Sequence, residues 1–251
     1  SDFQRCKYHI VNDIKDFDYP LTKKVITEMN MAYRKKGNDL EIKYINQLIA
    51  DGNNVLDIRS SQQVDKAALT SKSMQDGIDY IYQPHLKFEN WIGQPDIIKK
   101  IKGNSNLGDY YYVPIDIKLS SQPKTKNITQ VLVYCFLLSK EQGFMPDYFL
   151  IVNGQDLQKN KFYVNDFLTS FNSLKVSFEE FVKKNNNELY PEKCDFCNYE
   201  CEWEGTCASI WEKDNYLNLV ANINRNQIGK LKNNNIFSLP DLASSKLKSI
   251  K

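Results

Sequence analysis

The stretch that decides the fold is Gly93–Tyr134, GQPDIIKKIKGNSNLGDYYYVPIDIKLSSQPKTKNITQVLVY. Two β-rich runs, 93–101 and 110–119, flank a run of turn-forming residues at 103–109, and this pattern predicts a hairpin. The run 128–138 that follows has helical periodicity. We therefore predict a strand, a turn, a second strand and a helix, in that order.

Three charged side chains fall on the predicted hairpin. Asp96 lies on the first strand, and Asp116 and Lys118 lie two positions apart on the second, hence on one face of it. Carboxylate oxygens suit Mg²⁺ or Mn²⁺. A lysine beside them can orient or activate a water, or neutralise charge that develops on a phosphate. The alternative interpretation is a solvated hairpin with ordinary salt bridges.

The order of these residues resembles the motif of the PD-(D/E)XK nuclease superfamily. Gln94-Pro95-Asp96 stands at the first half of that motif and Asp116-Ile117-Lys118 at the second half. Gln130 and Tyr134, one helical turn apart, resemble the Q-x-x-x-Y signature of the RecB-like branch. P-D, then D-x-K twenty residues later, then Q-x-x-x-Y, in this order, are far more specific than an isolated D-x-K.

The resemblance implies a fold and a role for each residue. The fold would be α/β, a restriction-endonuclease-like core with a central mixed sheet flanked by helices. Asp96 and Asp116 would bind Mg²⁺ or Mn²⁺ together with the carbonyl of Ile117. Lys118 would position the attacking water or stabilise charge on the phosphate. From the following helix, Gln130 and Tyr134 would orient the DNA backbone or the region of Lys118.

Glu41 is the third candidate acid. It falls in the predicted helical stretch 21–52, near the start of the second of two helices. By resemblance, a glutamate in the first helix of the RecB-like fold joins the metal site, and a histidine often precedes it. Leu40 stands where that histidine is expected, which is a departure from the pattern. The alternative interpretation of Glu41 is an acid that the helix dipole favours in a first turn.

Four cysteines follow the predicted core, with the spacing C-x2-C-x3-C-x5-C: Cys194, Cys197, Cys201 and Cys207. Thiolates so close in sequence converge on one soft metal centre, and they predict a tetrahedral structural zinc site or, with Cys6, a [4Fe–4S] cluster. The resemblance implies the cluster, because iron–sulfur RecB-like nucleases use one cysteine before the core and three after it, spaced C-x2-C-x5-C. No three cysteines here fit both spacings, so the ligand set stays open.

Composition sets further limits. With 41% hydrophobic and 12% aromatic residues, the 251-residue chain can bury a core. It has no apolar run of membrane-spanning length and no visible signal peptide, so we expect a cytoplasmic location. The net charge is only +2, but residues 224–251 carry six Lys/Arg against one Asp. This tail, with Lys230 and Lys232, is a candidate phosphate contact; a solvated basic helix end is the alternative.

We expect three segments: a nuclease core at 1–187, whose Cys6 region packs with the later cysteines, a Cys-rich metal-binding segment at 188–214, and a small helical basic tail at 215–251. The runs 68–96 and 201–243 look like a bacterial group of RecB-like putative nucleases. In that group an RNase H-like domain often follows these segments. Since the chain also begins at Ser1 instead of Met, we expect it to be an excised piece of a longer protein. Its expected partner is such a downstream domain or a helicase.

The expected function is metal-dependent hydrolysis of phosphodiester bonds in DNA, at single strands or ends, with RNA as the other candidate substrate. The alternative is a catalytically inactive nucleic-acid-binding module on the same fold.

Overall fold

The computed structural model describes residues 2–25, 27–62, 64–154, 156–184, 189–199 and 201–245. The chain forms two compact units. The first, Thr27–Ser177, is called the sheet unit; the second combines Asp2–Ile26 with Phe178–Lys251 and is called the cysteine unit. The boundary predicted between residues 187 and 188 lies outside the described residues.

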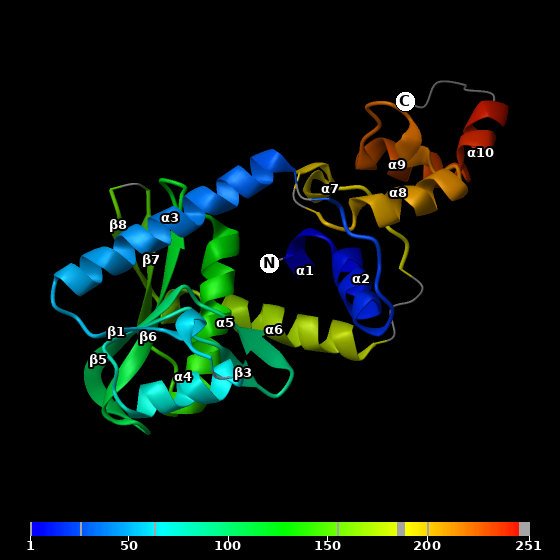
Figure 1. The fold of residues 1–251 in the computed structure, drawn as a ribbon. Coiled ribbons are helices and arrows are strands. Elements are labelled where there is room, and N and C mark those ends of the chain that lie inside the picture. Colours follow the sequence, from blue (N-terminus) through cyan, green and yellow to red (C-terminus); the bar gives the residue numbers. More distant parts are fainter. Residues whose placement is uncertain are drawn as a thin grey trace. The chain divides into compact units, whose positions relative to one another are not determined.

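The sheet unit is an α/β structure with a six-stranded mixed sheet, as predicted (Figure 1). In spatial order the strands are β1 (Val55–Asp57), β2 (Tyr80–Tyr82), β5 (Ile97–Ser105), β6 (Gly108–Lys118), β7 (Tyr148–Asn153) and β8 (Gln158–Tyr163). The β1–β2 and β6–β7 pairs are parallel and the other pairs are antiparallel. A separate small hairpin joins β3 (Leu86–Phe88) to β4 (Trp91–Gly93).

The central hairpin β5–β6 has a shorter turn than the sequence predicts. Its strands continue to Ser105 and resume at Gly108, where the predicted turn covered 103–109. The register shifts between Lys102 and Ser105, and Gly103 adopts a φ of 156° there. A glycine in such a bulge lets the strand continue past a conformation that other residues avoid. The glycine therefore marks an irregularity within the strand.

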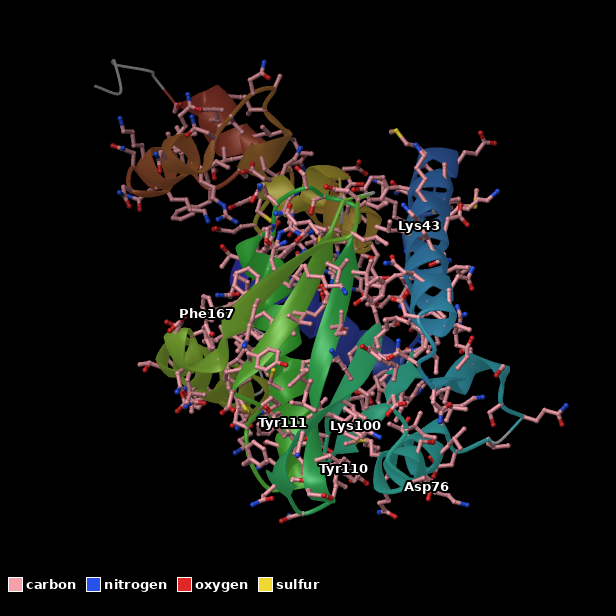
Figure 2. The ribbon with its side chains drawn as sticks, turned by 90° about the vertical axis from the view of Figure 1, so that its left-hand side faces the viewer. Lys43, Asp76, Lys100, Tyr110, Tyr111 and Phe167 are labelled. Atoms are coloured by element: carbon pink, nitrogen blue, oxygen red, sulfur yellow. The ribbon has the colours of Figure 1, made fainter. Side chains whose placement is uncertain are left out.

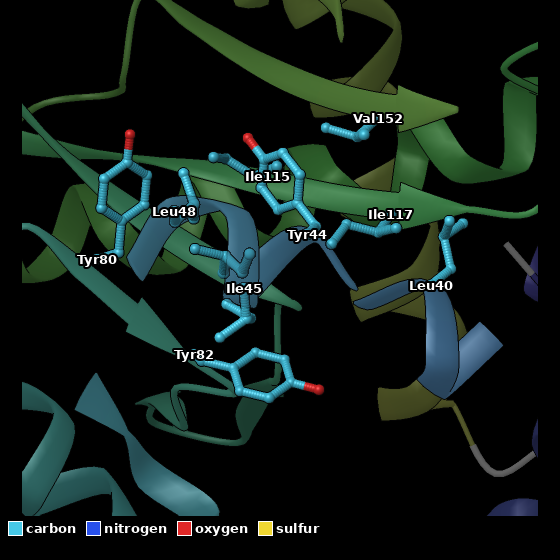
Figure 3. Packing of buried hydrophobic residues seen from close by; sticks show 10 residues of the cluster. Leu40, Tyr44, Ile45, Leu48, Tyr80, Tyr82, Ile115, Ile117 and Val152 are labelled. Atoms are coloured by element: carbon cyan, nitrogen blue, oxygen red, sulfur yellow. The ribbon is translucent and has the colours of Figure 1, made fainter. Parts of the chain in front are cut away.

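Helices cover both faces of the sheet. α3 (Glu28–Ala50) lies on one face, where its buried side chains pack against strand residues (Figure 3). This cluster contains Leu40, Tyr44, Ile45, Leu48, Tyr80, Tyr82, Ile97, Ile115, Ile117 and Val152. On the other face, α4 (Lys66–Gln75) and α5 (Thr125–Gln142) pack against a second cluster: Ile58, Met74, Ile81, Leu86, Ile98, Tyr112, Leu137 and Leu138.

The far end of the central hairpin is tied to the end of α4. The Tyr110 hydroxyl donates to the Met74 carbonyl at 2.9 Å, and Lys100 pairs with Asp79 at 2.7 Å (Figure 2). A third cluster joins α5 to β7 and α6 (Leu168–Lys183) through residues such as Val131, Phe149 and Phe171. β8 ends at Tyr163, and Val164–Asp166 follow as a short 3-10 helix.

α3 corrects the prediction for Glu41. It is one helix of 23 residues, where the sequence predicted two helices with Glu41 near the start of the second. Gly37 costs a helix interior about 1 kcal/mol relative to alanine, but burial of one face of the helix against the sheet outweighs this cost. Glu41 thus lies in the helix interior, and the interpretation as an acid in a first turn is wrong.

The cysteine unit is built from short helices and the end of α6. These are α1 (Asp2–Arg5), α2 (Lys7–Asp18), α7 (Asp195–Tyr199), α8 (Glu204–Lys213), α9 (Arg225–Lys232) and α10 (Leu239–Ser244), with a 3-10 turn at Leu217–Leu219. N- and C-terminal segments meet in it, since the Lys24 amide donates to the Glu202 carbonyl at 2.8 Å. Within the described part of the chain, no helix has the length and apolar character needed to cross a membrane.

Candidate active site and candidate metal centre

The register of the central hairpin brings two predicted acids together. Ile97 pairs with Ile115, so one further step of this antiparallel ladder places Asp96 opposite Asp116. Asp96 immediately precedes β5, and its Oδ2 accepts a hydrogen bond from the Ile117 amide at 2.6 Å. The two carboxyl groups therefore share one end of the hairpin.

Asp116 is buried with an incomplete set of partners. Its side chain is 1% exposed, and its Oδ1 accepts a hydrogen bond from Lys118 Nζ at 2.8 Å. Among the described residues, Oδ2 accepts no hydrogen bond of ordinary geometry, although it is shielded from solvent, and the Asp96 carboxyl lies close enough to Asp116 to share a proton with it. An unpartnered buried carboxylate oxygen is costly for a fold and is the donor that a divalent cation requires.

The electrostatics of the pair also favour a cation. Burial, the Asp116 charge and the Glu41 charge raise the pKa of Asp96 to about 8, although Lys118 opposes the shift. Burial likewise raises the pKa of Asp116, and Lys118 only partly offsets it. A divalent ion beside the two carboxyl groups would displace their protons and reverse both shifts.

Lys118 keeps its positive charge at this site. Burial alone disfavours the ammonium, but the neighbouring charges of Asp116 and Asp96 outweigh it and raise the pKa of Lys118 above its ordinary value. The side chain is 27% exposed, so the ammonium lies at the boundary between the buried acids and solvent. A charged donor in that position can contact a water or a phosphate oxygen.

Glu41 reaches the same acids from α3. Its charge contributes to the raised pKa values of Asp96 and Asp116, which places it in their electrostatic neighbourhood. Its Oε2 accepts hydrogen bonds from Tyr82 Oη at 2.9 Å and from Gln83 Nε2 at 2.8 Å. Tyr82 and Gln83 could not be found from the sequence, because neutral residues some forty positions from their partner carry no local signal.

Gln130 and Tyr134 form a pair on α5. Gln130 is exposed and its Nε2 donates to the Tyr134 hydroxyl at 2.7 Å. Burial raises the pKa of Tyr134, and the charges of Asp116 and Asp96 add to the effect, so the phenol lies near the acids. A Cβ on Gly93 would lie 2.6 Å from Leu137 Cδ1 and 3.0 Å from Tyr134 Cδ1. A larger residue at this position would therefore force the Leu137 or Tyr134 side chain to shift.

The residues predicted for catalysis are thus gathered in the sheet unit, and the acids among them fit a magnesium or manganese ion. Asp96, Asp116 and Glu41 would supply hard oxygen ligands from three different elements. Ile117 contributes its amide to the Asp96 carboxylate, and the role of its carbonyl stays a prediction. Leu40 points into the apolar cluster beside Ile117, where it packs as a core residue (Figure 3).

The cysteine unit contains five of the six free thiols, including all those predicted as ligands. Cys197, Cys201 and Cys207 are buried, whereas Cys6 and Cys194 are partly exposed. The sulfurs of Cys194 and Cys197 lie 3.6 Å apart. Cys6 interacts electrostatically with Cys194, Cys201 and Cys207, so α2 brings the fifth thiol into the group. Cys135 belongs to the sheet unit, where it is buried in α5.

The thiols fit a metal centre chemically. Burial, together with neighbouring thiols, raises the pKa of Cys197 to about 12 and of Cys201 to about 11. Metal binding requires thiolates, so a bound cation or cluster would reverse these shifts. The 3.6 Å separation of Cys194 and Cys197 suits the edge of a ZnS₄ tetrahedron, about 3.8 Å for Zn–S bonds of about 2.3 Å. Cysteines that bind different irons of a [4Fe–4S] cluster lie farther apart than this, so a cluster would take only one of these two thiols, together with Cys6, Cys201 and Cys207.

Side chains of α2 surround the sulfurs. His9 Nδ1 lies 3.4 Å from Cys201 Sγ, and Asn12 Nδ2 donates to Cys207 Sγ at 3.7 Å. Asp13 accepts a hydrogen bond from the buried Trp203 indole at 2.7 Å. Such polar partners fix the orientation of metal ligands. Trp203 is buried by this packing, which leaves its ring no face for stacking on a base.

The predicted nucleic-acid contacts fall in different units. Gln130 belongs to the sheet unit, whereas Lys230 and Lys232 lie on α9 of the cysteine unit. Lys230 is exposed. Lys232 pairs with Glu192 at 3.1 Å and lies over the Tyr216 ring at 5.2 Å. The last basic residues of the tail, Lys246, Lys248 and Lys251, lie outside the described residues.

Comparisons with protein-family models and with curated proteins found no match. Any function proposed for the chain therefore rests on the geometry of its sites and on the order of motifs in its sequence.

Proposed function

We propose that the chain is a RecB-like, divalent-metal-dependent nuclease that hydrolyses phosphodiester bonds in DNA, at single strands or ends. The observation that carries the proposal is the buried Asp116, whose Oδ2 lacks a partner among the described residues while Asp96 lies opposite and Lys118 pairs with Oδ1. A fold gains nothing from a buried acid, a half-buried acid and a lysine at one end of a hairpin, because each bears a desolvation cost.

Each residue has a role in this proposal. Asp96, Asp116 and Glu41 would hold Mg²⁺ or Mn²⁺, with the Ile117 carbonyl as a further ligand. The bound ion would supply Lewis-acid stabilisation of the phosphate and lower the pKa of a coordinated water. Lys118 would orient that water or stabilise charge on the phosphate. A hydrogen-bond donor from the Gln130–Tyr134 pair would orient the nucleic-acid backbone.

We further propose a structural metal centre in the cysteine unit. Cys6 with three of the four later cysteines would hold a [4Fe–4S] cluster; a zinc ion bound by four thiolates is the alternative. The centre would fasten the N-terminal helices to a segment almost two hundred positions later, as the His9–Cys201 contact already does. Closing so long a loop stabilises a fold by restricting the unfolded chain.

The test is cleavage of labelled single-stranded DNA, duplex DNA, circular DNA and RNA in Mg²⁺, Mn²⁺ or EDTA. The native chain is compared with Asp116→Asn and with Asp109→Asn, which alters an exposed acid on the same strand. Metal-dependent cutting that Asp116→Asn abolishes and Asp109→Asn retains supports the proposal. Cutting that persists in Asp116→Asn would refute it, and circular substrates separate endonucleolytic cutting from cutting at ends.

The second candidate function is a nucleic-acid-binding module without catalysis. The observation that favours it is Leu40, which packs against the core at the position where the resemblance implies a metal-binding histidine. This function predicts binding that weakens with salt, does not respond to Mg²⁺ and leads to no strand scission. Mg²⁺-dependent scission lost in Asp116→Asn excludes it.

A further inference from the structure

Gln83 contacts the two segments that supply the candidate acids other than Asp116: α3, which carries Glu41, and the segment before β5, which carries Asp96. Its Nε2 donates to Glu41 Oε2 at 2.8 Å, and its Oε1 accepts from Gln94 Nε2 at 2.9 Å. Its backbone amide donates to the Asp96 carbonyl at 2.8 Å. One residue is therefore bonded to Glu41 on α3 and to the Gln94–Asp96 segment that precedes β5.

The backbone of Gln83 explains how two adjacent residues reach one oxygen. Successive side chains of an extended strand point to opposite faces, yet Tyr82 and Gln83 both donate to Glu41 Oε2. Gln83 adopts a left-handed conformation with φ of 51°, which breaks the alternation as β2 ends. A residue other than glycine adopts this conformation at a cost, and such strain concentrates at functional sites.

The two donors restrict what Glu41 can do with its carboxylate. Both bonds engage Oε2, so they fix the carboxylate against rotation and leave Oε1 as the oxygen with capacity for a metal ion. Partners of this kind orient a metal ligand without touching the metal. The Gln94 bond and the Asp96 bond then couple the position of Glu41 to that of Asp96.

We propose that Gln83 is a positioning residue, which holds the Glu41 carboxylate at a fixed place relative to Asp96 for divalent-metal binding. This inference rests on the proposed function, because it assigns Gln83 to the same metal site. Tyr82 acts with Gln83 on the same oxygen, while Gln83 alone of the two also binds the Asp96 segment.

The experiment measures Mn²⁺ binding to the full chain by electron paramagnetic resonance, in buffer freed of metals without a chelator. Gln83→Met keeps the length of the side chain and removes its amide. Glu89→Met is the matched control, because Glu89 also has a φ of 51° but is exposed in the turn of the β3–β4 hairpin. Asp116→Asn serves as the reference, because the Mn²⁺ that the native chain binds and this variant does not bind is the ion held by Asp96, Asp116 and Glu41.

We expect Gln83→Met to weaken the Asp116-dependent Mn²⁺ affinity by about tenfold, with Glu89→Met unchanged. Asp116-dependent binding with native affinity in a folded Gln83→Met chain overturns the inference and leaves the proposed function standing. A native chain without Asp116-dependent binding overturns both. If Gln83→Met fails to fold, Gln83→Asn replaces it, because asparagine tolerates the left-handed conformation and its side chain is one methylene too short to keep the Glu41 bond. Native Mn²⁺ affinity in a folded Gln83→Asn chain also refutes the inference.

Discussion

The raised pKa of Asp96 predicts how the stability of the metal-free chain depends on pH. The carboxyl has a pKa of about 8 in the folded chain and about 3.9 in an unfolded chain. Between these values the folded state binds more protons at Asp96 than the unfolded state does, so the contribution of Asp96 to the free energy of unfolding is fully present below pH 4 and is lost as the pH rises toward 8.

The size of the effect follows from the same linkage. Each pH unit within this window is worth at most about 1.4 kcal/mol. From pH 5 to pH 7 the contribution of Asp96 therefore falls by about 2 kcal/mol, after a reduction for its partial exposure to solvent. Mg²⁺ should reverse the loss, because a ligand at a hundred times its Kd adds about 2.7 kcal/mol.

Urea unfolding of the native chain and of Asp96→Asn at pH 5, 6 and 7, in metal-depleted buffer, measures this contribution. The difference between the two chains cancels the titration of groups remote from Asp96 and the unfolding of the cysteine unit. We expect the native chain to lose about 2 kcal/mol relative to Asp96→Asn between pH 5 and pH 7. A difference that stays constant, or that grows in favour of the native chain, would refute the assignment of Asp96 as an acid that is protonated at pH 5 to 7 in the metal-free folded chain.

Three more outcomes follow from the structure. Lys118→Met should reduce cleavage by at least about 10²-fold, which single-turnover kinetics measure. It should also lower the unfolding free energy by about 2 kcal/mol in urea unfolding, because Asp116 loses its counter-ion. Near-native cleavage would contradict the role of Lys118. Gly93→Ala should cost about 1–3 kcal/mol, since the new Cβ would lie 2.6 Å from Leu137 Cδ1; an unchanged denaturation midpoint would contradict the close packing. Cys201→Ser should lose the metal that elemental analysis and visible absorption detect in the native chain. Cys135→Ser, which alters the thiol buried in α5, should retain it. Equal metal content in the two variants would contradict the assigned centre.

Much of the hairpin and its helix could be predicted because their signals are local. β-rich runs, turn residues and helical periodicity indicate element type within a few residues. The register of the β5–β6 pairing could not be predicted, because Gly103 is typical of a turn but lies in a bulge of β5. Only the observed pairing of Ile97 with Ile115 brings Asp96 opposite Asp116, so the sequence predicted the acids but not their geometry.

Other features depend on tertiary structure. The continuity of α3 through Gly37 comes from burial against the sheet, which local helix propensity does not report. Tyr82 and Gln83 contact Glu41 because β2 ends beside it and the backbone turns left-handed there. Cysteine spacing predicts the grouping of the four later thiols, whereas Cys6 was expected with them by resemblance alone, and α2 places it there.

The measurement that tests the central claim most directly is anomalous diffraction from crystals of the chain soaked in Mn²⁺. The claim is that Asp96 and Asp116 hold the catalytic cation. We predict an anomalous peak within bonding distance, about 2.2 Å, of Asp116 Oδ2 and beside the Asp96 carboxylate, absent from crystals of Asp116→Asn. A native crystal at saturating Mn²⁺ with no peak at Asp116 Oδ2, or the same peak in Asp116→Asn, would contradict it.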